Sequence, residues 1–256
     1  MEKETSMVDR QNRAVLKEVL NKVESSKDLD EVKSYLADTL NSINASEPLK
    51  DRAIYLFEKE KNCDVYASNE VIYLAPLSET VKEPFLEIIK GNATFPQAFE
   101  MEGYEDNVWK SHFKEGVFYC SIYIAKTGEF AGYCGIKGTG TEKWELVIEL
   151  LPAFQGQGIG RYALELMMSG LAESAGQHLF LAKVDPDNVA SQKLMEKLNG
   201  NPSGIEKFII TDDKVIREIE EECANEVDDR LRSLAAKFKV RPGALLTHIL
   251  VYTFER

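Results

Sequence analysis

The chain has 256 residues, of which 44% are hydrophobic and 29% are charged. These proportions are those of a folded globular chain with one large domain or a domain and extensions, and they exclude a wholly disordered protein. Asp and Glu number 43 against 31 Lys and Arg, which gives a formal net charge of −12. Such a field repels the phosphates of nucleic acid and of anionic lipid surfaces, so we expect neither as a partner.

The sequence contains no run of eighteen apolar residues, and its first residues lead into no apolar segment of signal-peptide type. We therefore expect neither a membrane span nor export, and we expect the protein to be cytoplasmic. The four cysteines show no Cys-x-x-Cys spacing, and none of the three histidines lies at ligand spacing from another histidine or from a cysteine. Free thiols in a reducing compartment and no metal site are the expectation.

Apolar residues at helical spacing, interspersed with charges, run through residues 9–62 and predict two or three amphipathic helices. Pro48 breaks this pattern because proline disfavours helix in the residue before it, and the pattern resumes over residues 49–61. We therefore predict a helical N-terminal extension over residues 1–68.

From residue 71 the composition turns β-branched and aromatic, which predicts a strand over 71–77 followed by a helix from Ser78. Two further apolar runs, at 117–125 and 130–136, flank a short polar turn that contains Gly128. Glycine accepts the positive φ of a tight hairpin, so these two runs are expected to pair antiparallel.

The next part of the chain alternates strands and helices. The strands are predicted at 144–151 and 178–184, and the helices that follow them are predicted at 159–175 and 188–198. The first of these helices begins directly after a glycine-rich turn that follows Pro152.

Towards its end the chain is less regular. A strand is predicted at 204–210 and a last strand at 246–255. Between them, residues 212–242 are dense in charges and carry apolar residues at helical spacing, which predicts a helical insert. We therefore predict one domain over 69–256 that this insert interrupts.

The glycine-rich turn carries the clearest chemical signal. It reads Gln155-Gly156-Gln157-Gly158-Ile159-Gly160-Arg161. Glycines lack the Cβ atom, so a phosphate can approach the backbone, and free N–H groups at the positive end of a helix then hold its charge. The spacing is not that of a dinucleotide-binding turn after a first strand, and no Gly-Lys-Ser/Thr of a Walker loop follows.

Gln155, Gly158 and Gly160 match the Gln/Arg-x-x-Gly-x-Gly/Ala loop of the GNAT superfamily of N-acetyltransferases, which this sequence resembles. A second run, at 184–191, is similar to the Asn-x-x-Ser segment of that family. The resemblance implies the GNAT fold, an α+β fold with a central, mixed, mostly antiparallel twisted sheet of about six or seven strands flanked by helices. It also implies acetyl-CoA as the cofactor and CoA as the product.

The resemblance covers about residues 71–210 and the last strand at 246–255. Within the superfamily, the run from Ile72 to Leu77 and the position of Glu145, ten residues before Gln155, look most like the branch that contains spermidine and ribosomal-protein N-terminal acetyltransferases. The function so implied is transfer of an acetyl group to a primary amine by direct attack on the thioester. The acceptor is a polyamine, another small amine, or the amino group of a peptide or protein.

The resemblance also implies which residues bind the cofactor. Main-chain groups of Leu150 and Leu151 pair with the pantetheine arm, and the N–H groups from Gln155 to Arg161 bind the pyrophosphate. Asn188 either reaches the cofactor or only caps its helix, and Ser191 has the same two interpretations. Arg161 either neutralises phosphate charge or is a solvated helix residue.

Amine acetylation needs a neutral nitrogen, yet an alkyl ammonium has a pKa of about 10.4 and is protonated at neutral pH. Strand alternation places Glu145, Val147 and Glu149 on one face, so two carboxylates are candidates for the base. Glu145 matches an acidic position of the spermidine-type branch and is the first candidate, and Glu149 is the second. Either is otherwise a solvated strand glutamate, and a bulge in this strand would separate the two.

Members of the family often protonate the departing thiolate with a tyrosine seven residues after the asparagine of the second run, and this position is Met195 here. A thioether donates no proton, so the general acid stays unassigned, with Tyr133 and Tyr162 as available phenols. The alternative function is a CoA-binding protein with weak or no catalysis, whose helical segments at 1–62 and 212–242 mediate homodimerisation or bind a partner.

Overall fold

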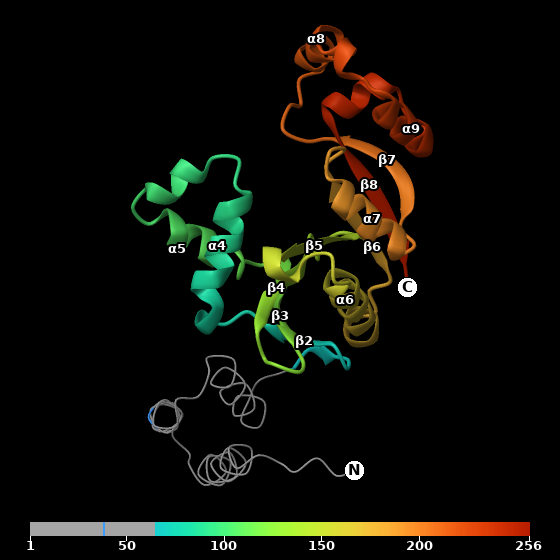
Figure 1. Cartoon of the computed structure of the whole chain (residues 1–256). Coiled ribbons are helices and arrows are strands. Elements are labelled where there is room, and N and C mark those ends of the chain that lie inside the picture. Colours follow the sequence, from blue (N-terminus) through green and yellow to red (C-terminus); the bar gives the residue numbers. More distant parts are fainter. Residues whose placement is uncertain (1–37, 39–64) are drawn as a thin grey trace, which may run out of the picture.

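The computed structural model of the chain describes residue 38 and residues 65–256 (Figure 1). The helices predicted within residues 9–62, and with them most of the predicted extension over 1–68, lie outside the described residues. No helix in the described part of the chain is long and apolar enough to cross a bilayer.

The described residues build one eight-stranded sheet in the spatial order β1-β2-β3-β4-β5-β6-β8-β7. The strands are β1 (Ala67–Ser68), β2 (Ile72–Pro76), β3 (Val117–Ile124), β4 (Phe130–Lys137), β5 (Trp144–Leu150), β6 (Leu179–Val184), β7 (Asn201–Lys207) and β8 (His248–Glu255). All neighbouring pairs are antiparallel except β5 and β6, which are parallel. The predicted α+β class with a mixed, mostly antiparallel sheet is confirmed, and the additional strand is β1, which is too short to show a periodic pattern.

Helices connect the strands. The α-helices of the described residues are α4 (Lys82–Asn92), α5 (Tyr104–Ser111), α6 (Ile159–Ala175), α7 (Val189–Lys197), α8 (Asp213–Glu222) and α9 (Asp229–Phe238). Short 3-10 helices are η1 (Glu79–Val81), η2 (Pro96–Glu100), η3 (Pro152–Phe154), η4 (Ala224–Glu226) and η5 (Pro242–Leu246). In Figure 1, α4 and α5 lie to one side of β3, β4 and β5, and α6 lies to the other.

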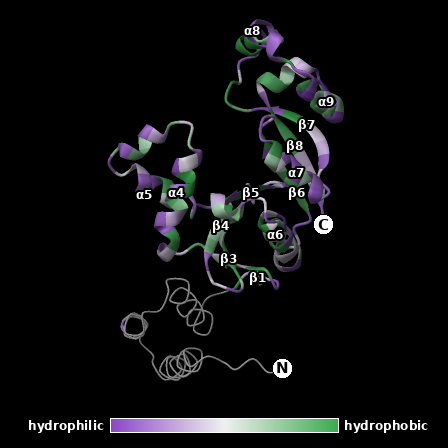
Figure 2. Ribbon diagram, viewed as in Figure 1, coloured by the Kyte–Doolittle hydropathy of each residue, from purple (hydrophilic) through white to green (hydrophobic). Residues whose placement is uncertain are grey.

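Two hydrophobic cores form on the two faces of the sheet. One includes Leu164 of α6, Met195 of α7 and Phe238 of α9. The other includes Phe85 of α4 and Trp109 of α5. Side chains along a strand alternate between its faces, so each central strand contributes to both cores. Figure 2 shows hydrophobic residues in the strands and along α6, with hydrophilic residues on the outer helices α5 and α8.

The predicted hairpin joins β3 to β4, and Gly128 in its turn has φ +77°. The strand predicted at 204–210 was placed too late, because β7 runs over Asn201–Lys207 and residues 208–210 lie beyond it. Its position is fixed by pairing with β8, and the register shifts between Pro202 and Gly204, where Gly204 has φ +120°. The pairing with β8 therefore outweighs the apolar composition of residues 208–210.

The parallel strands β5 and β6 separate soon after they begin. They pair only at Trp144 with Phe180 and at Glu145 with Leu181. Beyond this point β5 continues beside β4, and β6 continues beside β8. The later part of β5 consequently has an edge with no neighbouring strand among the described residues.

The segment between β7 and β8 contains α8, η4, α9 and η5. Leu231, Leu234 and Phe238 of α9 pack into the same core as α6 and α7. The buried Glu220 of α8 accepts hydrogen bonds from Arg241 Nη2 at 3.0 Å and from Thr247 Oγ1 at 3.2 Å. These contacts attach the segment to the rest of the domain.

We predict that Gly132→Ala destabilises the fold. Gly132 has φ +147°, and a Cβ atom there would lie 2.2 Å from the carbonyl oxygen of Glu149. The backbone of β5 would have to move, so the free energy of unfolding should fall by about 3 kcal/mol or more, measured by urea denaturation. The control is Gly91→Ala, where nothing lies within 4 Å of the new methyl group and stability should be kept or slightly raised. Equal stabilities of the two variants would contradict the close approach of β4 to β5.

Candidate functional site

Two helices begin where β5 and β6 separate. β5 leads through η3 into α6, and β6 leads through a turn at 185–188 into α7. The N-terminal end of α6 packs against α7, because a Cβ atom on Gly160 of α6 would lie 3.3 Å from Leu194 Cδ2 of α7. The N-termini of both helices therefore lie at the open end of the sheet.

The glycine turn before α6 is held by its own side chains. Gln155 Nε2 donates to the carbonyl of Leu150 at 2.9 Å, and Gln157 Nε2 donates to the carbonyl of Ala153 at 2.6 Å. The turn also needs left-handed backbone at two positions, since Gly156 has φ +73° and Gly158 has φ +83°. Glycine adopts this conformation without a steric penalty, which explains its presence at these positions.

The main-chain amides in the middle of the turn are free. The N–H groups at its two ends are used, since Gln155 donates to the carbonyl of Pro152 and Arg161 donates to the carbonyl of Gly158, but the amides of residues 156–160 have no acceptor among the described residues. Residues 155–158 are exposed. Free N–H groups at the positive end of a helix bind an anion such as a phosphate. The predicted loop thus has the geometry of an anion site.

Arg161 lies at the start of α6, where its Nε pairs with Glu165 Oε1 at 2.9 Å. This ion pair runs along the helix surface and half of the arginine side chain is exposed. This exposed pair agrees with the interpretation of Arg161 as a solvated helix residue. The other nitrogens of the guanidinium remain accessible to solvent at the N-terminal end of α6.

The main chain at the end of β5 is largely occupied. The carbonyl of Leu150 accepts from Gln155, the amide of Leu151 donates to Ala131 at 2.9 Å, and the carbonyl of Leu151 accepts from Phe154 at 2.9 Å. Pairing of a ligand with main-chain groups is therefore more accessible along the free edge of β5 before Leu151 than at Leu151 itself.

Asn188 caps α7. Its Oδ1 accepts a hydrogen bond from the amide of Ser191 at 2.9 Å, so the capping interpretation describes the structure. Asn188 is exposed and Ser191 is half-buried, and both lie at the same end of the sheet as the glycine turn. The cap uses the side-chain oxygen Oδ1 of Asn188. The side-chain nitrogen Nδ2 of Asn188 has no acceptor among the described residues.

Glu145 and Glu149 share one face of β5, as strand alternation predicts. The register with β4 runs without a shift from Glu145 to Leu150, so no bulge separates the two glutamates on that side. This face is the one that packs against α4 and α5, because Val147 between them contacts that core while Ile148 and Leu150 contact the other. The two carboxylates are four residues apart, about 13 Å along the strand.

The structure gives the two glutamates different partners. Glu145 pairs with Lys183 of β6 at 3.4 Å, and Lys183 also pairs with Glu206 of β7 at 2.9 Å. Glu145 thus lies where β5 and β6 are still joined, with its charge offset by a lysine. Glu149 instead accepts a hydrogen bond from Asn92 Nδ2 of α4 at 2.8 Å and lies opposite Tyr133 of β4 in the register.

Two buried tyrosines, Tyr133 and Tyr119, lie close enough to Glu149 to feel its charge. Burial raises the pKa of Tyr133 far above its ordinary value, and the charge of Glu149 and a hydrogen bond with it raise that pKa further. Burial likewise raises the pKa of Tyr119, and the charges of Glu145 and Glu149 add to the effect. Both phenols therefore keep their protons at neutral pH, which preserves Tyr133 as a hydrogen-bond donor to the carboxylate.

His112 lies against the same aromatic group. Its ring is 4.8 Å from that of Phe85 and 4.7 Å from that of Tyr119. Burial lowers the pKa of His112, and a hydrogen bond with the carbonyl of Val108 partly opposes the shift. The imidazole is consequently neutral at pH 7, and its role in the structure is packing around the site.

The residues considered as proton donors lie in different places. Met195 is buried in the core beneath α7, and Tyr162 is 38% exposed on α6. Only Tyr133 contacts a candidate base. Sequence reasoning missed Asn92, which is 57 positions away from Glu149 and gives no local signal. It also gave Tyr133 no role, although the register of β4 and β5 places Tyr133 opposite Glu149.

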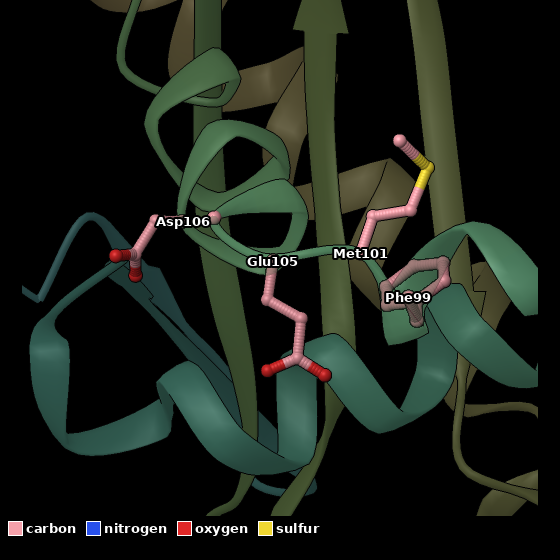
Figure 3. Close-up of a pocket in the computed structure, with 5 residues that line it drawn as sticks. Phe99, Met101, Glu105 and Asp106 are labelled. Carbon is pink, nitrogen blue, oxygen red and sulfur yellow. The ribbon is translucent and has the colours of Figure 1, made fainter.

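A shallow hollow of about 190 Å³ lies between η2 and α5 and is drawn in Figure 3. It is lined by Phe99, Met101, Gly103, Glu105 and Asp106. Asp106 points away from Phe99 and Met101, and its carboxylate pairs with Lys82 at 2.7 Å. The hollow shares no lining residue with the loop or with the surroundings of Glu149. Among the described residues, no group of three or more His, Cys, Asp or Glu side chains could hold a metal ion.

Part of the chain matches the model of a known protein family. Residues 79–201 match the family model described as an acetyltransferase (GNAT) domain. A search among curated proteins found no match.

Solved structures share the fold. A RimL ribosomal L7/L12 alpha-N-protein acetyltransferase without ligand is 15% identical with a TM-score of 0.52, and the match covers 76% of this chain and 95% of that one. A structure of a RimL enzyme with coenzyme A is 15% identical with a TM-score of 0.51 and coverages of 73% and 95%. An acetyltransferase from Salmonella typhimurium that modifies the N-terminal serine of L7/L12 is 15% identical with a TM-score of 0.50 and coverages of 73% and 96%.

The split sheet, the glycine turn at the start of α6 and the matching family model agree with one another. Residues 79–201 therefore carry a GNAT-type acetyltransferase domain, and the enzymes of that family use acetyl-CoA as their acetyl donor.

Proposed function

We propose that this protein transfers the acetyl group of acetyl-CoA to a primary amine, and that Glu149 accepts the proton of the amine. The observation that carries the proposal is the separation of β5 from β6, which brings the free amides of residues 156–160 and the face of Glu149 to the same end of one strand. The donor supplies an acetyl group activated as a thioester.

The cofactor fits the open end of the sheet. Its pyrophosphate carries negative charge, and the amides of residues 156–160 offer hydrogen bonds and the positive end of α6. Its pantetheine arm contains amide groups, and the free edge of β5 before Leu151 offers main-chain partners for them. Asn188 and Ser191 at the start of α7 complete the set on the other side of the split.

The amine approaches from the face that carries Glu149. An ammonium is attracted to the carboxylate, which removes one proton and leaves the neutral nitrogen that attacks the carbonyl carbon of the thioester. As the new C–N bond forms and the C–S bond breaks, the nitrogen loses a second proton and the departing sulfur gains one. Asn92 and Tyr133 hold Glu149 in place by hydrogen bonds.

The acceptor is a primary amine in a cationic molecule. The chain has a net charge of −12, and the face of β5 to β7 near the split carries Glu145, Glu149 and Glu206 against Lys183. Two of the fold neighbours act on N-termini of ribosomal proteins, which makes a peptide or protein amino group the first class to test and a polyamine the second. Thiol release from acetyl-CoA, measured over both classes, tests the proposal.

The alternative function is a CoA-binding protein with weak or no catalysis. Met195 favours it, because this position carries no phenol and the methionine is buried in the core. The two functions differ in one measurement. A CoA-binding protein binds the cofactor but releases no thiol with any peptide, protein or polyamine tested. An acetyltransferase releases thiol and forms the acetylated amine in equal amounts.

Gln157→Glu should weaken binding of CoA. The substitution keeps the shape of the side chain and adds a negative charge beside the amides that face the pyrophosphate. We expect the dissociation constant, measured by calorimetry, to rise by about tenfold, and the loss to shrink in high salt. The control is Gln97→Glu, an exposed position of η2 with the same charge change, which should bind CoA like the unaltered protein. Equal affinity of both variants would remove the pyrophosphate from this turn.

Glu149→Gln should lower kcat by about 10²-fold, because the neutral amide cannot accept the proton of the ammonium. The matched variant is Glu145→Gln, whose carboxylate is already paired with Lys183 and for which we expect a smaller loss. Steady-state rates, measured for both variants with the acceptor that the unaltered protein acetylates fastest, show which loss is larger. A larger loss for Glu145→Gln would return the role of base to Glu145.

Tyr133→Phe should lower kcat by about fivefold. The phenol holds the Glu149 carboxylate by a hydrogen bond, so its removal leaves the proposed base held by Asn92 alone. Steady-state rates with the same acceptor measure the loss. Tyr104→Phe removes a phenol from α5 and should leave kcat in place. An unchanged kcat in Tyr133→Phe would assign Tyr133 a packing role only.

A further inference from the structure

The turn between β6 and α7 is fixed by a residue from a distant part of the chain. Arg230 of α9 donates from Nη1 to the carbonyl of Pro186 at 2.6 Å, and its Nη2 pairs with the carboxylate of Asp187. Gln192 of α7 donates to the same carbonyl of Pro186 at 2.8 Å. The buried peptide carbonyl before Asp187 thus has two donors, one from each helix.

The same turn begins α7 and carries Asn188. Asp185 Oδ1 accepts from the amide of Asp187 at 2.7 Å, and the carbonyl of Asp185 accepts from the amide of Asn188 at 2.9 Å. These local bonds shape the turn but do not attach it to the rest of the protein. Arg230 supplies an attachment from outside the local sequence, directly before the cap of α7.

The helix that carries Arg230 is anchored in the core. It is near the start of α9, where Asp228 caps the helix by accepting from the amide of Leu231 at 2.7 Å. Leu231, Leu234 and Phe238 of the same helix are buried in the core shared with α6 and α7. A guanidinium on such a helix can hold the turn at a fixed position relative to the N-terminus of α6.

We propose that Arg230 is a positioning residue for cofactor binding, through which the helical segment between β7 and β8 sets the position of Asn188 opposite the glycine turn. The proposal rests on the function proposed above, because it requires the cofactor to contact the start of α7. It gives α9 a role in affinity for acetyl-CoA, although α9 lies outside the residues that the family model matches.

The surroundings of Arg230 separate this role from a contribution to stability. The side chain of Arg230 is 41% exposed and that of Asp187 is 82% exposed. An exposed ion pair contributes little to the free energy of unfolding. Loss of the guanidinium should therefore loosen the turn locally while the core of α9 keeps the domain folded.

The test compares Arg230→Ala with Arg232→Ala. Arg232 lies two residues further along α9, and its side chain bonds to Asp229 of the same helix at 2.9 Å and to no other residue in the described part of the chain, so it is the matched control. We expect Arg230→Ala to weaken CoA about fivefold, measured by calorimetry, and to raise the KM for acetyl-CoA with kcat nearly unchanged. Amide hydrogen exchange of residues 187–191 should become faster in this variant alone.

A double-mutant cycle identifies the route of the effect. If Arg230 acts through Asn188, Arg230→Ala should weaken CoA much less in an Asn188→Ala background than in the unaltered protein. Additive losses would mean that Arg230 acts elsewhere and would overturn the proposal. If Arg230→Ala does not fold, Asp187→Asn removes only the ion pair, and it should weaken CoA to a smaller extent.

The outcomes separate this inference from the proposed function. Absence of CoA binding by the unaltered protein would overturn the proposed function and the inference together. Normal CoA binding by the unaltered protein and equally tight binding by Arg230→Ala and Asp187→Asn would overturn the positioning role alone.

Discussion

The architecture depends on the parting of two parallel strands. β5 and β6 share two residue pairs and then follow different neighbours, β4 on one side and β8 on the other. Backbone N–H and C=O groups need partners, so a strand edge that opens in the middle of a sheet is a place where a ligand can supply them. The antiparallel strands on either side keep the gap open, because each holds its own half of the sheet along its full length.

The two faces of β5 contact different parts of the structure. Ile148 and Leu150 anchor the strand in the core beneath α6 and α7, which orients the glycine turn that follows. The opposite face carries Val147 into the aromatic core of α4 and α5 and presents Glu149 to Asn92 and Tyr133. One strand therefore positions both the proposed cofactor loop and the proposed base, and the distance between them follows from strand geometry.

The parts of the fold that were predictable from the sequence are those with local signals. The glycine turn, the hairpin at Gly128 and the helix that begins at Ile159 are each written within a few consecutive residues. The different surroundings of Glu145 and Glu149 were not predictable, because alternation places both on one face and their partners, Lys183 and Asn92, lie far away in the chain. The predicted end of β7 was wrong because a local signal was misleading. Phe208 and Ile209 are typical strand residues, but they lie beyond the strand and are 57% and 78% exposed.

The buried Met195 bears on the choice between catalysis and binding alone. A phenol at this position would supply a proton to the departing thiolate, and methionine supplies none. The proton balance of amine acetylation does not require it, because an ammonium gives up two protons as it becomes an amide and the proposed base, Glu149, accepts only the first. The second is available for the sulfur at the moment the C–S bond breaks. Met195 therefore changes which group carries the last proton, and it leaves the reaction chemically complete.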